Sequence, residues 1–147
     1  MKNIAIIGLG QLGSRHLQAL ALVRDHLNIE LVDISDEALE TAYRRFLEVD
    51  NSKNFKGLVK KFNSIDQLSA NLDLVIIASN SKERRMITEQ LLNAKNVTHL
   101  ILEKVLFPTL EDYEEVSELL SIKKTNTWVN CSRRSMPSYQ KIKELLT

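Results

Sequence analysis

The chain alternates short apolar runs with longer segments in which apolar residues recur every three or four positions. The runs predict strands, which span residues 3–8, 29–33, 57–62, 72–79, 98–103 and 126–131. Residues 3–8 and 72–79 have the continuous apolar character expected of strands buried on both faces. The segments between the runs predict helices, which span residues 11–23, 35–49, 81–94, 109–121 and 136–146. This alternation indicates an α/β fold with a doubly wound parallel sheet.

The order of the elements also predicts the topology. Parallel neighbours need crossover connections, which are almost always right-handed. We therefore expect residues 1–147 to form one Rossmann domain with strand order 3-2-1-4-5-6 and helices on both faces. Ser35, Ser81 and Thr109 are the expected N-caps of three helices, because a side-chain oxygen at that position can accept from a first-turn N–H group.

A glycine-rich turn follows the first predicted strand and opens the first helix. Its pattern is G-x-G-x-x-G, from Gly8 through Gly10 to Gly13, with Gln11 and Leu12 between the last two glycines. In a dinucleotide site the first glycine permits a tight turn, the second lets the backbone approach a pyrophosphate, and the third lets helix and strand pack closely. The N–H groups of the helix start would then bind the anion.

Asp33 supports the same interpretation and selects the cofactor. It ends the second predicted strand, at the offset expected of the acid that accepts from the adenosine ribose. A carboxylate there would repel the 2′-phosphate of NADP. The next residues, Ile34 and Ser35, include no arginine to bind that phosphate. We therefore expect NAD as the cofactor, with NADP less favoured, and another adenosine compound such as S-adenosylmethionine remains the alternative ligand.

Composition narrows the class of protein. The 147 residues carry a net charge of +1, from 20 basic and 19 acidic residues, so no nucleic-acid partner is expected. No apolar run is long enough to span a bilayer, and the N-terminus lacks a signal-peptide pattern. The lone Cys131 and the scattered His16, His26 and His99 predict no metal site. We expect a cytoplasmic protein.

Four segments give the chain a family resemblance. They are "IGLGQLGSRHLQAL", "DLVIIASNSKERR", "LILEKVLFPTLEDYEEV" and "VNCSRRSMPSYQKIKELL". Together they resemble the N-terminal cofactor domain of the glucose-fructose oxidoreductase / inositol dehydrogenase / MocA (Gfo/Idh/MocA) family. Three positions depart from it: Asn80 and Val105 stand where the family usually has proline, and Arg84 stands where a histidine is common.

The resemblance implies an NAD-dependent dehydrogenase that acts on a carbohydrate. Lys104 would lie beside the nicotinamide and the substrate hydroxyl as the catalytic residue, and Glu103 would line the pocket and hold Lys104. Ser79 and Asn80 would present hydrogen-bonding groups to the nicotinamide half of the cofactor. Arg134 would lie on the ligand side of the sheet. The substrate would be a sugar or a sugar nucleotide.

The resemblance also implies a second, substrate-binding domain after this one, and the chain stops before it. We therefore expect cofactor binding with little or no turnover, and the sequence predicts no oligomeric state. Two alternatives stay open: a stand-alone regulatory module that senses NAD(H), and a scaffold with a vacant site. Of the remaining residues, we expect Phe107 and Trp128 in the core, and Arg44-Arg45 and Arg84-Arg85 on solvated helix faces.

Overall fold

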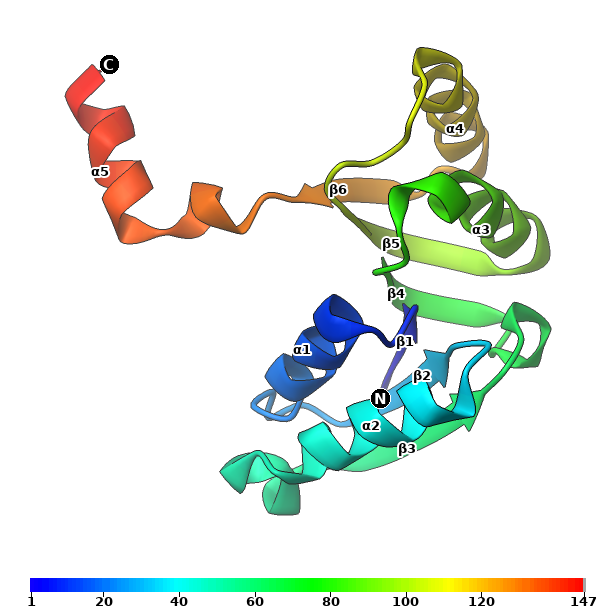
Figure 1. The fold of residues 1–147 in the computed structure, drawn as a ribbon, viewed down its shortest axis with the longest axis vertical. Coiled ribbons are helices and arrows are strands. Elements are labelled where there is room, and N and C mark those ends of the chain that lie inside the picture. The colour runs from blue at the N-terminus through cyan, green and yellow to red at the C-terminus, as the bar shows by residue number, and fades with distance from the viewer. Residues whose placement is uncertain (147) are drawn as a thin grey trace.

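A computed structural model describes residues 1–146 of the chain (Figure 1). Six parallel strands form one sheet in the order β3-β2-β1-β4-β5-β6, which confirms the predicted topology. The strands are β1 (Lys2–Ile7), β2 (Leu27–Val32), β3 (Gly57–Phe62), β4 (Asn71–Ile77), β5 (Asn96–Glu103) and β6 (Asn126–Asn130). Their bounds agree with the predicted runs to within two residues.

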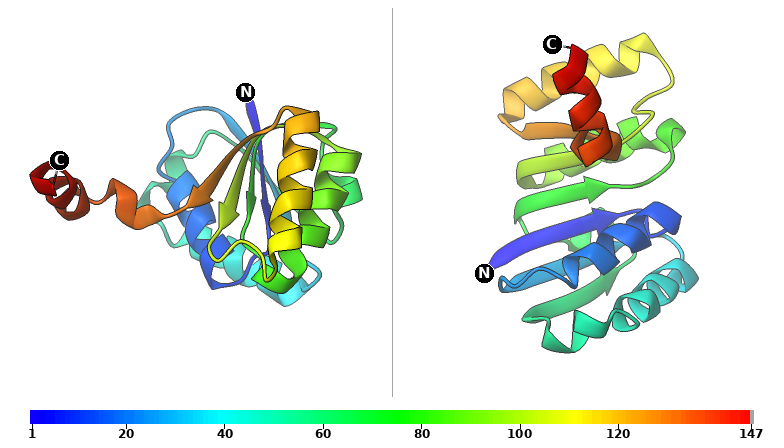
Figure 2. Two further views of the ribbon diagram at one scale, coloured as in Figure 1. Left: turned by 90° about the horizontal axis from the view of Figure 1, so that it is seen from above. Right: turned by 90° about the vertical axis from the view of Figure 1, so that its left-hand side faces the viewer.

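The helices are α1 (Gln11–Leu20), α2 (Asp36–Leu47), α3 (Ser81–Ala94), α4 (Leu110–Lys123) and α5 (Pro137–Leu146), with short 3-10 helices η1 (Asp50–Asn54), η2 (Ile65–Gln67) and η3 (Ser132–Ser135). All the α-helices except α5 lie in two layers, one on each face of the sheet (Figures 1 and 2). Helices α1 and α2 cover one face, and α3 and α4 cover the other.

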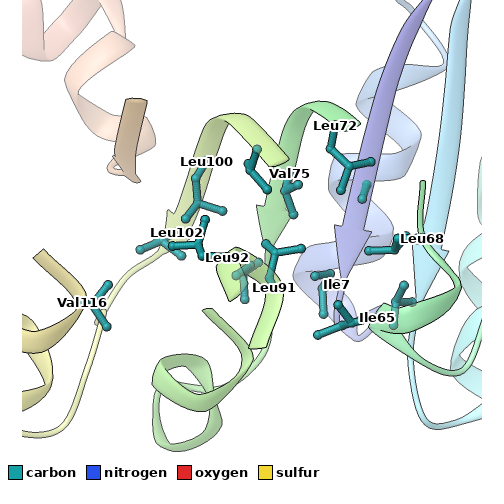
Figure 3. Close-up of a cluster of buried hydrophobic side chains, with 14 of the residues drawn as sticks. Ile7, Ile65, Leu68, Leu72, Val75, Leu91, Leu92, Leu100, Leu102 and Val116 are labelled. Carbon is teal, nitrogen blue, oxygen red and sulfur yellow. The ribbon is translucent and has the colours of Figure 1, made fainter. Parts of the chain in front are cut away.

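Two apolar clusters explain the continuous apolar runs of the strands. On the α3/α4 face, Ile7 and Leu102 pack with Leu91 of α3 and Val116 of α4 (Figure 3). Ile6, the neighbour of Ile7, lies in the cluster of the α1/α2 face. Successive side chains of a strand point to opposite faces. A strand with a helix layer on both sides therefore needs apolar residues at every position.

The helix starts follow capping chemistry, with one correction to the prediction. Ser35 caps α2, and Thr109 forms a reciprocal capping box at the start of α4. Ser81, however, is the first residue of α3 rather than its cap. The cap is Asn80, whose side chain accepts from the N–H groups of Lys82 and Glu83, because asparagine is as good an N-cap as serine.

The β6 edge of the molecule is the least packed part. Helix α5 stands away from the sheet (Figures 1 and 2) and buries none of its described side chains. Trp128 on β6 is 55% exposed, so its predicted core position is wrong; its ring stacks on His99, with centroids 5.5 Å apart. The core position of Phe107 is confirmed. No helix in the part of the chain that the structure describes is long and apolar enough to cross a membrane.

Candidate functional site

A cleft of about 600 Å³ opens at the carboxyl ends of β1, β2 and β4. The strand order reverses between β1 and β4, and ligands of doubly wound sheets bind at such a switch point. Its floor and walls are largely apolar, from side chains such as Val32 and Ile87. Six of the predicted cofactor-binding residues line the cleft: Gly8, Gly10, Asp33, Ile34, Ser79 and Asn80.

The three glycines of the turn have three different geometries. Gly8 has φ of +87°, a conformation that side chains disfavour, and a Cβ there would lie 2.7 Å from the Ser79 nitrogen. A Cβ on Gly13 would lie 1.9 Å from the Gly8 carbonyl oxygen. A Cβ on Gly10 would meet no described heavy atom within 4 Å. Gly10 therefore faces open space, and the turn fits the close approach of a pyrophosphate.

Helix α1 begins beside this open space. Its N-cap, Gly10, offers no side chain to the first-turn N–H groups, and those groups have no acceptor inside the helix. Gln11, Leu12 and Gly13 supply the first three of them. They border the cleft without lining it, and an anion at the helix start could accept from them.

Asp33 braces the glycine turn from the end of β2. Its Oδ2 accepts from the Leu9 N–H at 2.6 Å, and its Oδ1 accepts from the Ser35 N–H at 2.9 Å. Each oxygen of a carboxylate can accept a second hydrogen bond, so the group can still accept from ribose hydroxyls. Ile34, at the rim, is 93% exposed. The glycine turn and Asp33, which the sequence analysis linked, are thus in direct contact.

Asn63 is a cleft residue that the motif did not include. It follows β3, and its Nδ2 donates to Asp36 Oδ1 at 2.7 Å and to the Asp33 carbonyl oxygen at 3.3 Å. It therefore fixes the loop that carries Asp33. The available signal was its place directly after a predicted strand, since the carboxyl ends of parallel strands meet at one edge.

The residues predicted to act at the nicotinamide half of the cofactor are not all gathered in the cleft. The Asn80 side chain is occupied in capping α3, and its Nδ2 donates to Glu83 Oε2 at 2.9 Å. Lys104 is exposed after β5, and Arg134 is exposed in η3. Neither lines the cleft. The structure thus brings together the residues predicted to bind the pyrophosphate and the ribose, and it leaves Lys104 and Arg134 exposed, nearer the β6 edge.

Glu103 is buried, with 3% of its surface exposed. Its Oε1 accepts from Asn130 Nδ2 at 2.5 Å and lies 2.7 Å from His16 Nε2. Burial alone would raise the pKa of this carboxyl, but these two hydrogen bonds and the charges of His16 and Arg84 outweigh it, so the pKa is lowered. Its described side-chain hydrogen bonds join α1 and β6 and do not reach Lys104.

Arg84 corrects the prediction of a solvated helix face. It is 3% exposed, and its guanidinium donates to the carbonyl oxygens of Glu103, Val105, Leu106 and Ser79. Burial lowers the pKa of Arg84, although Glu103 and Tyr113 oppose the shift. The sequence signal was its spacing to Thr88 and Leu91, both fully buried on α3. Arg85 does face the surface, in ion pairs with Glu89 and acids of α4.

Arg45 also departs from the solvated face predicted for it. It is half-buried, and its Nη1 donates to Ser14 Oγ at 2.7 Å and to Gln11 Oε1 at 3.3 Å. The contact ties α2 to the first turn of α1. Among the described residues, no group of three or more histidine, cysteine and acidic side chains is placed to hold a metal ion.

Known structures share this architecture. A Gfo/Idh/MocA family oxidoreductase from Vibrio cholerae superposes with a TM-score of 0.79 at 22% identity, over 99% of this chain and 44% of that one. The Gal80p super-repressor mutant from Saccharomyces cerevisiae gives 0.78 at 19%, over 98% and 38%. The WlbA dehydrogenase from Chromobacterium violaceum, in complex with NADH and UDP-GlcNAcA, gives 0.69 at 21%, over 87% and 34%.

The chain therefore spans less than half of each of these proteins. A search of curated proteins found no match. The model of the oxidoreductase family with an NAD-binding Rossmann fold, Gfo/Idh/MocA, matches residues 2–131. That match covers the glycine turn, Asp33 and the Glu103-Lys104 segment. The chain belongs to the Gfo/Idh/MocA oxidoreductase family, of which it carries the NAD-binding domain.

Proposed function

We propose that the chain binds NAD(H) in the β1–β4 cleft as part of an oxidoreductase that transfers a hydride between NAD and a hydroxyl carbon of a sugar or sugar nucleotide. The observation that carries the proposal is that Asp33 braces the glycine turn. The Leu9 N–H donates to Asp33 Oδ2, with 2.6 Å between the two atoms. An apolar cleft with a few convergent polar groups is typical of a cofactor site.

The residues of the cleft would divide the cofactor between them. Gly8 and Gly10 would let the backbone approach the pyrophosphate, with the N–H groups of Gln11, Leu12 and Gly13 as donors. Asp33 would accept from the adenosine ribose, while exposed Ile34 would border the adenine. Ser79, half-buried in the opposite wall, would contact the nicotinamide half together with the backbone of Asn80.

Lys104 is the proposed catalytic residue. When bound, the nicotinamide supplies the hydride chemistry. Lys104 would orient the substrate hydroxyl and hold or accept its proton at Nζ. Glu103 would act indirectly, because its side chain is hydrogen-bonded to His16 and Asn130. Arg134 would face the substrate side. Because Lys104 and Arg134 are exposed, further protein surface is needed around them, and we expect little or no turnover from these 147 residues alone.

The sugar class of the substrate is the least constrained part of the proposal. Its support is the WlbA dehydrogenase, whose structure contains NADH and UDP-GlcNAcA. A nicotinamide nucleotide in the cleft would end near the carboxyl ends of β4 and β5, where Lys104 follows its strand. A substrate bound at that edge would therefore place its hydroxyl carbon close to both the nicotinamide and Lys104.

The preference for NAD over NADP is tested by calorimetric titration of both nucleotides in parallel. We expect NAD to bind at least about tenfold more tightly, a gap of roughly 1.4 kcal/mol. Asp33→Asn keeps an acceptor for the Leu9 N–H but removes the charge, so the gap should close. Glu37→Gln, an exposed acid on α2, is the matched control and should keep it.

The two ways in which this test can fail are distinct. Absence of binding by either nucleotide would remove the cofactor function from this chain. A gap that survives Asp33→Asn would leave the cofactor in place and refute the role of Asp33 in choosing it.

A regulatory module that senses NAD(H) without catalysis is the second candidate. The observation that favours it is that Lys104 is exposed and lies outside the cleft, so cofactor binding can proceed without it. A sensor should bind NADH and NAD with clearly different affinities. A ratio of affinities near one would argue against the sensor.

A further inference from the structure

Arg84 joins two loops that come from different parts of the chain. The cofactor loop, residues 78–80, follows β4 and forms one wall of the cleft. The lysine loop, residues 104–106, follows β5 and carries Lys104. Both loops lie at the carboxyl edge of the sheet, and Arg84 in the first turns of α3 lies between them.

We propose that Arg84 is a positioning residue that couples the cofactor loop to the lysine loop, so that cofactor binding sets the position of Lys104. This inference rests on the proposed function. The Arg84 side chain does not line the cleft, although it contacts the carbonyl oxygen of Ser79, which does. It would act through the backbone of the two loops.

The hydrogen bonds give the coupling a geometric basis. One nitrogen, Nη2, donates to the carbonyl oxygen of Ser79 in the cofactor loop. The other, Nη1, lies 2.5 Å from the Glu103 and Val105 carbonyl oxygens and 2.9 Å from that of Leu106. Lys104 is thus bracketed by two peptide carbonyls that contact the same nitrogen atom.

The guanidinium suits this task better than other cationic groups. It is planar and rigid, with donors spread in a fixed fork, whereas a lysine ammonium is a compact point charge. A displacement of the Ser79 carbonyl therefore turns or shifts the whole group, including the nitrogen that contacts the lysine loop. A lysine at position 84 could satisfy some carbonyls but could not transmit the displacement in the same way.

Stability alone does not explain a cation at this position. Arg84 is 3% exposed, and its Nε has no hydrogen-bond partner among the residues that the structure describes. Removing a cation from water is costly, and an apolar side chain of similar volume is often at least as stabilising. The Lys104 side chain, in contrast, is exposed, so its position depends on the backbone that Arg84 holds.

The experiment follows backbone amides by NMR while the 147-residue chain is titrated with NAD. We expect NAD to shift the Gly8 and Gly10 amides and also those of Val105 and Leu106. In Arg84→Lys the glycine shifts should remain, NAD affinity should change by less than about threefold, and the Val105 and Leu106 shifts should fall by at least about half. Arg85→Lys makes the same change at the neighbouring surface residue and should behave as the unmodified protein.

Hydrogen exchange in the unmodified protein gives a second measurement, independent of whether Arg84→Lys folds. NAD should slow exchange of the Val105 and Leu106 amides. The inference is overturned if NAD protects Gly10 but not these amides, or if Arg84→Lys keeps their NMR shifts. A merely structural arginine would lower the melting temperature without changing which amides respond to NAD. If NAD changes no amide at all, the proposed function fails as well.

Discussion

The two halves of the carboxyl edge of the sheet differ in how complete they are. Around β1, β2 and β4, the glycine turn, Asp33 and the apolar walls already enclose a cleft. Around β5 and β6, Lys104 and Arg134 stand in solvent. We therefore expect nucleotide binding and substrate chemistry to be separable, because the described residues form a cleft in the first half and leave Lys104 and Arg134 exposed in the second.

The difference follows from packing. Residues of β1 face an apolar cluster on each side of the sheet, so the glycine turn that follows is held by two cores. Strand β6 is an edge strand, and α5 beyond it buries none of its described side chains. Elements with few buried contacts open at little cost in free energy.

The largest effect should come from breaking the complete half with Gly13→Ala. The added methyl would lie 1.9 Å from the Gly8 carbonyl oxygen, so α1 must move away from the turn. We expect loss of NAD binding and a fall in the free energy of unfolding of about 1–3 kcal/mol or more, measured by calorimetric titration and thermal unfolding.

Gly10→Ala is the matched control, because its methyl meets no described atom within 4 Å. It should leave the melting temperature nearly unchanged while NAD affinity falls, since the methyl occupies the open approach to the backbone. If both variants retained NAD affinity, the turn would not be the pyrophosphate site.

An intermediate effect on the free energy of unfolding is expected at Glu103, which lies between the two halves. Its folded-state pKa is lowered from an ordinary value of 4.5. Its contribution to stability is therefore present above that value and is lost as the pH falls through the folded-state pKa. Glu103→Gln should lower the free energy of unfolding at pH 7 by about 1.5–3 kcal/mol and should flatten its decline in acid. Urea unfolding at several pH values measures both, and parallel pH profiles would contradict the prediction.

Substitutions in α5, beyond the β6 edge, should have only a small effect on the free energy of unfolding. Ile142 of α5 is 51% exposed, so Ile142→Ser should change the free energy of unfolding by no more than about 0.5 kcal/mol. A loss well above that value in chemical denaturation would mean that α5 packs against the sheet in solution.

The smallest effect on cofactor binding should come from Lys104→Ala. Because Lys104 lies outside the cleft, NAD affinity should change by less than about twofold, roughly 0.4 kcal/mol. A tenfold loss in the same titration would show that Lys104 contacts the cofactor and that the two halves are not separable.

The sequence predicted the fold, and the candidate residues Gly8, Gly10 and Asp33 line one cleft in the structure. Continuous apolar runs arise only where a strand has a core on both faces, and the positions of Gly8, Gly13 and Asp33 follow from backbone geometry that few residues tolerate. These constraints are local, so they can be recognised without the tertiary structure.

Two features were missed because they depend on long-range contacts. Arg84 is a charged residue whose acceptors are carbonyls that come together only in the folded chain. Trp128 was expected in the core, but no described helix covers its face of β6. Composition of the segment predicts neither of these outcomes. The capping role of Asn80 is local by contrast, since its side chain accepts from the N–H groups of Lys82 and Glu83, and the prediction missed it by placing the cap one residue later, at Ser81.

The double engagement of Asp33 has a consequence for redesign of the cofactor preference. The carboxylate that would distinguish NAD from NADP also accepts from the Leu9 N–H, so specificity and the shape of the turn share one side chain. An engineer who introduces a small residue at position 33 to admit a phosphate would also leave a donor of the turn without its acceptor. A successful exchange will need a new acceptor for Leu9, supplied together with the new cationic partner.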